Sequence, residues 1–128
     1  MKLLLDTHIV LAFVDQDLED RFPAIARDFA RNNPDIAISA ASIWEIAIKT
    51  RLKKLNPRID PHLIPSYLRD LGLFILDITH AHVTADISPD ILTRDPFDRL
   101  LLAQAQIEGM RFVTIDSALI DHPLSFRV

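Results

Sequence analysis

The sequence KLLLD at residues 2–6 sets three consecutive leucines directly before an aspartate. A short apolar run with a polar end is typical of a buried strand, and Asp6 or Thr7 then caps a helix that reaches about Val14. Similar runs recur along the chain. Further strands are predicted at 35–39, 73–78, 111–116 and, as a fifth, 125–128.

Prolines and glycines mark where the helices between these strands begin and end. Pro23, Pro61 and Pro96 suit first helical positions, and Gly72 and Gly109 suit positions just after a helix. Strands that alternate with helices predict an α/β fold, in which a parallel sheet is covered by helices on both faces. Helices are predicted at 7–14, 23–33, 40–52, 61–71, 80–86 and 96–108, followed by a helical turn at 117–120.

The composition predicts one domain over residues 1–128. The apolar fraction of 49% is enough for a core, and the absence of cysteine excludes disulfides, zinc fingers and thiol catalysis. No stretch has the pattern of a secretory signal or a membrane span, so we expect a soluble cytoplasmic protein without membrane contact. A net charge of −4 gives no general attraction for nucleic acid. It does not exclude an enzyme that binds phosphates through cations.

Four acids that lie far apart in the sequence are predicted to meet at one edge of the sheet. Asp6 and Asp116 end predicted strands, and ligands of open α/β sheets bind beyond the carboxyl ends of the strands. Glu45 lies in the second turn of the helix after 35–39. Asp98 lies in the first turn of the helix that leads back into the predicted strand at 111–116, so this helix starts at the same edge.

Carboxylates that are gathered in this way repel one another. At about 4 Å and an effective dielectric constant near 20, each pair costs about 4 kcal/mol. A divalent cation between them removes this cost. The pattern therefore predicts a metal site, and a metal site indicates metal-assisted hydrolysis.

Each acid also has an ordinary structural explanation. Asp6 and Asp116 suit helix N-caps, and Glu45 suits a capping box with Ser42 if that helix begins late. Asp98 near a helix N-terminus gains about 0.3–1 kcal/mol from the helix dipole. One such explanation is unremarkable, whereas four on one edge favour a shared site.

Four segments together resemble a known family, in order and in spacing: LLLDTHIVLAF, ISAASIWEIAIKTRLKKL, RDPFDRLLLAQAQIEGM and FVTIDSAL. They are similar to the PIN-domain ribonucleases, and most of all to the VapC-type toxins of type II toxin–antitoxin modules. The resemblance covers nearly the whole chain. It implies a PIN-like domain whose parallel sheet has about five strands in the order 3-2-1-4-5.

The resemblance also implies an activity and its partners. The implied reaction is endonucleolytic cleavage of RNA by a water that is activated by Mg²⁺ or Mn²⁺. Such a toxin is expected to form a homodimer and to be silenced by a VapB-like antitoxin that covers or enters the acidic cleft. The implied metal ligands and catalytic residues are Asp6, Glu45, Asp98 and Asp116.

Several neighbours of these acids are expected to support them. The Thr7 hydroxyl is placed to position Asp6 or a ligand water, and Asp95 is expected to cap its helix and to act indirectly on the site. Ser117 stands where many PIN-domain relatives carry an acidic or polar neighbour of the last acid. Trp44 and Phe97 are expected to belong to the core.

Basic residues near the acids are candidates for contacts with the RNA backbone. Lys49, Arg51 and Lys53 lie toward the end of the helix that carries Glu45, and Arg99 follows Asp98. An alternative explanation is equally good for the first three, because cations stabilise the C-terminus of a helix.

Two other functions stay open from the sequence. One is a PIN-like binding or scaffold protein with a degenerate site, although all four acids are present. The other is an α/β phosphotransfer domain. That class needs paired acids early in the chain and a lysine near the last strand, whereas no lysine follows Lys54.

Overall fold

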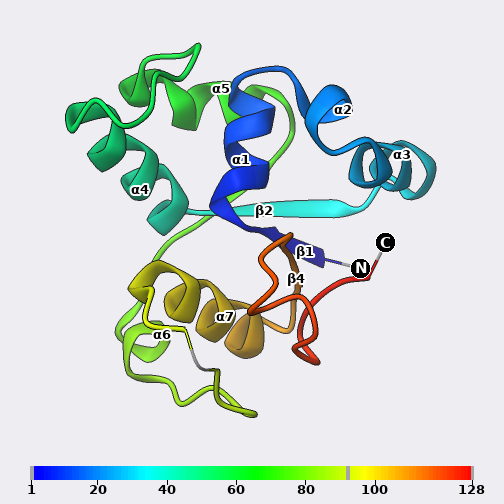
Figure 1. The fold of residues 1–128 in the computed structure, drawn as a ribbon, viewed down its shortest axis with the longest axis vertical. Helices are drawn as coiled ribbons and strands as arrows, with labels where there is room; N and C mark the ends of the chain where they lie inside the picture. Colours follow the sequence, from blue (N-terminus) through cyan, green and yellow to red (C-terminus); the bar gives the residue numbers. More distant parts are fainter. Residues whose placement is uncertain (1, 92, 128) are drawn as a thin grey trace.

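The computed structural model describes residues 2–91 and 93–127 and has the predicted α/β architecture (Figure 1). Its strands form one parallel sheet in the order β3-β2-β1-β4. This order agrees with the first four members of the expected 3-2-1-4-5 arrangement. The strands are β1 (Lys2–Leu5), β2 (Asp35–Ser39), β3 (Phe74–Leu76) and β4 (Arg111–Val113).

Helices cover both faces of this sheet. In Figure 1, α1, α3 and α5 lie above the sheet, and α6 and α7 lie below it. The helices are α1 (Thr7–Val14), α2 (Leu18–Arg21), α3 (Pro23–Asn32), α4 (Ala40–Arg51), the 3-10 turn η1 (Pro61–Leu63), α5 (Ile64–Asp70), α6 (His80–Thr84) and α7 (Pro96–Glu108).

Strand β1 has three apolar residues in a row because both of its faces are covered by the core. Leu3 and Leu5 pack into the cluster formed with α1, α3 and α5, whereas Leu4 packs into the cluster on the α7 side. All three are fully buried. Burying such a side chain contributes about 1.5–3 kcal/mol, so β1 is the shared centre of both halves of the core.

The fifth predicted strand is reduced to a single bridge in the described part of the chain. Ser125 bridges Phe112 in parallel, with hydrogen bonds from Phe112 N–H to Leu124 O (2.8 Å) and from Phe126 N–H to Phe112 O (2.7 Å). The next N–H toward the N-terminus on this side, that of Leu124, donates to His122 Nδ1 (3.1 Å) instead of to β4, so the pairing does not continue. Position 128 of this predicted strand lies outside the described residues.

Other differences are at element ends. The short helix α2 was not predicted, because a four-residue helix with no buried side chain leaves no periodic signal. The predicted helix at 61–71 divides into η1 and α5, whereas the predicted helical turn at 117–120 is present and is closed by the bond from Ile120 N–H to Asp116 O (2.9 Å). The predicted strands at 73–78 and 111–116 are each cut to three residues.

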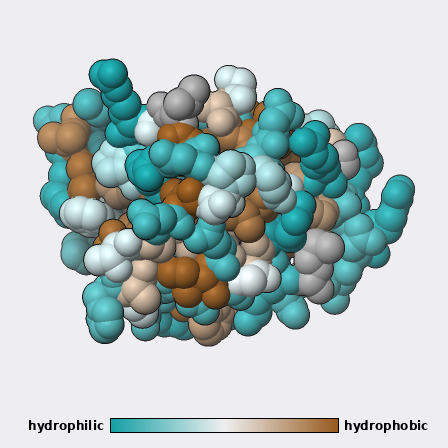
Figure 2. Space-filling model, turned by 90° about the horizontal axis from the view of Figure 1, so that it is seen from below, coloured by the Kyte–Doolittle hydropathy of each residue, from teal (hydrophilic) through white to brown (hydrophobic). Residues whose placement is uncertain are grey.

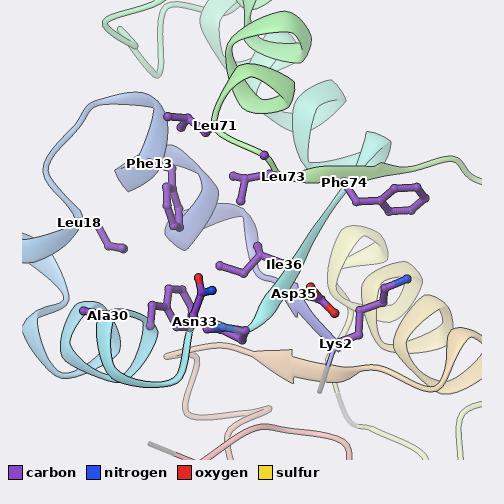
Figure 3. Close-up of a pocket in the computed structure, with 13 residues that line it drawn as sticks. Lys2, Phe13, Leu18, Ala30, Asn33, Asp35, Ile36, Leu71, Leu73 and Phe74 are labelled. Carbon is purple, nitrogen blue, oxygen red and sulfur yellow. The ribbon is translucent and has the colours of Figure 1, made fainter.

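The two ends of the sheet differ in chemistry. A pocket of about 660 Å³ lies at the amino ends of the strands (Figure 3). Its lining includes the first residues of β1, β2 and β3, which are Lys2, Asp35 and Phe74. Apolar side chains such as Ile36 and Leu73 share its wall with polar ones such as Asn33. The four acids predicted to form a site lie beyond the opposite, carboxyl ends.

The surface on the α6 and α7 side is mixed in character. Figure 2 shows hydrophobic side chains there as separate patches among hydrophilic ones. In the described part of the chain, every helix is too short or too polar to cross a bilayer.

Candidate active site

Asp6 is fixed at the carboxyl end of β1 by hydrogen bonds to three residues. Its backbone N–H donates to Val113 O (2.9 Å) and thereby extends the pairing of β1 with β4. Its Oδ1 accepts from the Thr7 N–H (2.7 Å), and its Oδ2 accepts from the Thr114 hydroxyl (2.6 Å). The side chain is 3% exposed. Asp6 therefore caps α1, as predicted, while its carboxylate is held in one orientation.

Burial raises the pKa of the Asp6 carboxyl above its ordinary value of 3.8, and the charge of Glu45 acts in the same direction. The hydrogen bonds from Thr114 and Thr7 and the charge of His8 oppose this rise, because they stabilise the ionised form. The two threonines thus favour a carboxylate where burial alone would favour the acid.

Glu45 is joined to Asp6 through Thr7. The Thr7 hydroxyl donates to Glu45 Oε1 (2.7 Å) and lies 3.0 Å from the Ser42 hydroxyl. Lys49 Nζ, one turn along α4, donates to Glu45 Oε2 (2.7 Å). Glu45 is only 7% exposed. Each oxygen of this buried carboxylate therefore has the hydrogen-bond donor that burial requires.

The capping box that was considered for Glu45 is wrong. Helix α4 begins at Ala40 and is capped by Ser39, whose hydroxyl accepts from the Ala41 N–H (3.0 Å). Ser42 therefore lies inside the first turn and is free to contact Thr7 instead. Glu45 lies in the second turn, so its position is not explained by capping.

Asp98 has the least satisfied carboxylate of the cluster. It is 8% exposed, yet no residue within 2–91 or 93–127 donates a hydrogen bond to it. Burial raises its pKa to about 7. The charges of four other acids add to this rise, in order of effect: Asp6, Asp95, Asp116 and Glu45. Acids from three other parts of the chain, together with Asp95 at the start of the same helix, therefore lie close enough to Asp98 to repel it.

Asp95 and Asp116 have structural duties as well. Asp95 caps α7, since its Oδ1 accepts from the Phe97 N–H (2.9 Å). Asp116 Oδ1 accepts from the Ala118 N–H (2.8 Å) and so closes the turn after β4. Asp116 is half-buried, whereas its neighbour Ser117 is exposed. One oxygen of each acid is thus engaged locally and the other is not.

Lys49 is the cation of this edge. The hydrogen bond to Glu45 raises the pKa of Lys49; burial opposes the rise, and the charges of Glu45, Asp95 and Asp98 add to it. Its side chain therefore lies between the acid of α4 and the acids of α7. Among the predicted RNA contacts, Lys49 is the one that lies beside the acids in the structure.

The other predicted RNA contacts lie differently. Arg51 and Lys53 are exposed at the far end of α4, where a cation also stabilises the helix terminus. Arg99 donates to Asp90 Oδ1 (3.1 Å) and to Ile91 O (3.4 Å), so it is held by the loop before α7. Its predicted contact with RNA would require this pair to open.

The donor set fits a hard divalent cation. It consists of carboxylate oxygens, with surplus negative charge at Asp98, and such ligands suit Mg²⁺ or Mn²⁺. In the described ranges, however, no three acidic or histidine side chains converge on one point as a ready-made cage. Mg²⁺ usually keeps several waters and binds through one or two carboxylates. Two carboxylates would thus be enough for such a site, and the residues that could hold a cation are Asp6 and Asp98, with Glu45 and Asp116 directly or through water.

Two residues of this site were missed from the sequence. Thr114 bonds both the Asp6 carboxylate and, through its hydroxyl, the Asp116 N–H (3.0 Å). Its only signal is the Thr-x-Asp spacing at the end of the last strand. Ser42, fully buried beside Thr7, had no signal beyond its place in the first turn of α4.

The expectation that Trp44 belongs to the core is wrong. Trp44 is 56% exposed, and it meets Phe97 edge to face, with 5.6 Å between the ring centroids and 65° between the ring planes. The apolar residues of α4 surround the helix too widely for one stripe, so the buried side could not be identified from periodicity. Ile46 takes the fully buried position instead.

Comparison with known proteins agrees with this fold. The PIN domain model matches residues 3–123. Ribonuclease VapC16 of Mycobacterium tuberculosis is 36% identical over 80 residues, which are 56% of this chain and 57% of that protein. The chain thus matches little more than half the length of this relative. The structure of VapBC2 from Rickettsia felis bound to a DNA fragment from its promoter is also similar, with a TM-score of 0.62, 19% identity and coverage of 98% of this chain and 96% of the other. At that identity the likeness concerns the fold.

Proposed function

This chain belongs to the PIN domain family, and we propose that it is a VapC-type endoribonuclease that hydrolyses RNA phosphodiester bonds with Mg²⁺ or Mn²⁺. The observation that carries this proposal is the state of Asp98. Its carboxylate is buried without a described donor, and acids from other segments help to raise its pKa to about 7. A fold that needed only structure would gain by neutralising this charge, whereas a cation site requires it.

Asp6 and Asp98 would hold the cation, with Glu45 and Asp116 as further or water-mediated ligands. When bound, a divalent cation lowers the pKa of a coordinated water and neutralises charge that develops on the phosphate. The chain's own contribution is to fix its acids. Thr114 would orient the Asp6 carboxylate, and its bond of 2.6 Å favours the ionised form against the effect of burial.

The remaining polar residues position Glu45. The Thr7 hydroxyl holds Oε1 and Lys49 holds Oε2, both at 2.7 Å, so Glu45 has a fixed rotamer before any substrate arrives. Lys49 also carries a positive charge at the edge where a phosphate would bind. A charged hydrogen bond to a phosphate oxygen would place the substrate without reading its sequence.

We also propose a role as the toxin of a toxin–antitoxin pair. Similarity to a protein named ribonuclease VapC16 and to a VapBC complex supports a VapB-like antitoxin as partner. A homodimer, cytoplasmic location and one domain over residues 1–128 remain part of this proposal. The phosphotransfer alternative finds no support in the family match. A PIN-like scaffold without activity stays the competing function.

The test is RNA cleavage by purified protein in Mg²⁺, in Mn²⁺ and in a chelator. We expect metal-dependent products with 5′-phosphate and 3′-hydroxyl ends, and no cleavage by Asp6→Asn or Asp98→Asn. Asp35→Asn is the matched control, because this exposed acid lies at the opposite end of the sheet. Full Mg²⁺-dependent activity in pure Asp6→Asn would refute the assignment. If the wild-type protein binds the metal but cleaves no RNA, the alternative of a PIN-like scaffold without activity is favoured.

A further inference from the structure

An aromatic pair, made of the exposed Trp44 and the half-buried Phe97, joins the two helices that supply Glu45 and Asp98. Trp44 directly precedes Glu45 on α4, and Phe97 directly precedes Asp98 on α7. The rings meet edge to face at 5.6 Å, and the two helices are in contact. Figure 1 shows α4 and α7 starting from the same side of the sheet. The pair therefore lies at the border of the acidic site.

Trp44 is unusual for a core-forming residue type. It is the only tryptophan in the chain, and 56% of it is exposed. An edge-to-face contact covers one side of a ring and leaves the indole open to another flat partner. This exposed aromatic surface lies beside a charged site. Through its contact with Phe97, Trp44 borders both Glu45 on α4 and Asp98 on α7.

We propose that Trp44, supported by Phe97, is a stacking platform for a nucleobase next to the phosphate that is cut. This inference rests on the proposed nuclease function and narrows it. Aromatic side chains stack on any base, but only on a base that is not already stacked in a duplex. The substrate class is therefore unpaired RNA, such as a single strand or a loop.

Two cations follow the pair along α4, and they suit the backbone of RNA. Lys49 lies one turn beyond Glu45 and pairs with it at 2.7 Å, and the exposed Arg51 follows toward the helix end. A strand with a base on Trp44 could place one phosphate at the acids and its neighbours along this basic side. Base stacking combined with a line of cations is the usual design of proteins that bind single-stranded nucleic acid.

The single tryptophan gives a direct measurement. In the Asp6→Asn variant, which should bind but not cut, fluorescence excited at a wavelength that Tyr67 does not absorb reports Trp44 alone. We expect quenching by a short unpaired RNA and much less by an abasic ribose-phosphate oligomer of equal length, which keeps the phosphates and lacks the bases. The same RNA annealed into a duplex should also quench less.

Kinetics give a second measurement. Trp44→Ala should raise the KM for cleavage by about 5- to 150-fold with a much smaller change in kcat, which corresponds to about 1–3 kcal/mol for one stacked base. Trp44→Phe, which keeps an aromatic face, should fall between Ala and wild type. Phe74→Ala is the matched control, because this ring is similarly exposed, at 52%, but lies at the other end of the sheet. Thermal unfolding of each variant checks its fold.

Three outcomes would overturn the stacking proposal. Equal quenching by abasic and normal RNA would show that only phosphates are bound. A fluorescence change that follows protein concentration instead of RNA would assign Trp44 to a protein interface. An unchanged KM in folded Trp44→Ala would remove the residue from substrate binding. In each case loss of cleavage in Asp98→Asn would leave the nuclease proposal standing, so the two failures are distinguishable.

Discussion

Replacing Asp98 by asparagine should stabilise the metal-free protein above neutral pH. The carboxylate of Asp98 is buried, lacks a described hydrogen-bond donor and is repelled by neighbouring acids. Asparagine has nearly the same size and removes the charge. A purely structural role at the start of α7 predicts the opposite sign, since loss of a carboxylate there costs about 0.3–1 kcal/mol.

The magnitude follows from the pKa. Asp98 has an ordinary value of 3.8 in the unfolded chain and about 7 in the folded protein. At about 1.4 kcal/mol for each pKa unit, the ionised form destabilises the fold by up to about 4 kcal/mol. Solvent that reaches part of the side chain reduces this to about 2–4 kcal/mol. Because the folded state binds the proton more tightly, this penalty is absent below about pH 4, grows as the pH rises toward 7 and is complete above it.

The assay is chemical or thermal unfolding of wild type and Asp98→Asn in a chelator, at about pH 5 and about pH 8. We expect the variant to be more stable at the higher pH, by about 10 °C in Tm, and the difference to shrink at the lower pH. Asp35→Asn, an exposed acid far from the cluster, should change stability by no more than about 0.5 kcal/mol. If Asp98→Asn is less stable than wild type at both pH values, the carboxylate is structural and the repulsion argument is refuted.

Three further predictions concern the residues around Asp98. Mg²⁺ at about 100 times its dissociation constant should stabilise wild type by about 2.7 kcal/mol and Asp98→Asn by clearly less, as measured by thermal unfolding with and without the ion; equal shifts would place the ion elsewhere. Thr114→Val should lower cleavage by about 10- to 100-fold and move the acid limb of its pH profile upward, because Asp6 loses a donor that favours its ionised form; an unchanged profile would contradict this. Lys49→Met should tighten Mg²⁺ binding by about three- to tenfold in calorimetry, since a competing cation on Glu45 is removed; weaker binding would count against that competition.

The positions of the acids were accessible from the sequence because each lies at the end of an element. Asp6 follows a run of leucines that must be buried, and Asp98 follows a proline that must begin a helix. In a parallel sheet these ends are forced to the same edge. Their roles as metal ligands remain predictions, but their placement required only topology.

The side chains that surround these acids could not be predicted from the sequence in the same way. The bond between Thr114 and Asp6 depends on the register that sets Leu5 opposite Val113, and no local pattern encodes that register. The exposure of Trp44 depends on which side of α4 faces the core. Ile46 marks that side, but apolar residues occur all around the helix, so their pattern does not identify it. Both errors concern side-chain surroundings that only the packed fold determines.

The contact between Thr114 and Asp6 joins positions 108 apart in the chain. A ribosome adds about 5–20 residues per second, so about 5–20 s pass between synthesis of the two partners. Until β4 has emerged and paired with β1, the Asp6 carboxylate has neither its backbone anchor at Val113 nor its hydroxyl donor. On the proposed nuclease function, we therefore expect a nascent copy to stay inactive toward the message and the ribosome that produce it until β4 has paired with β1, because only then is the Asp6 carboxylate held in place.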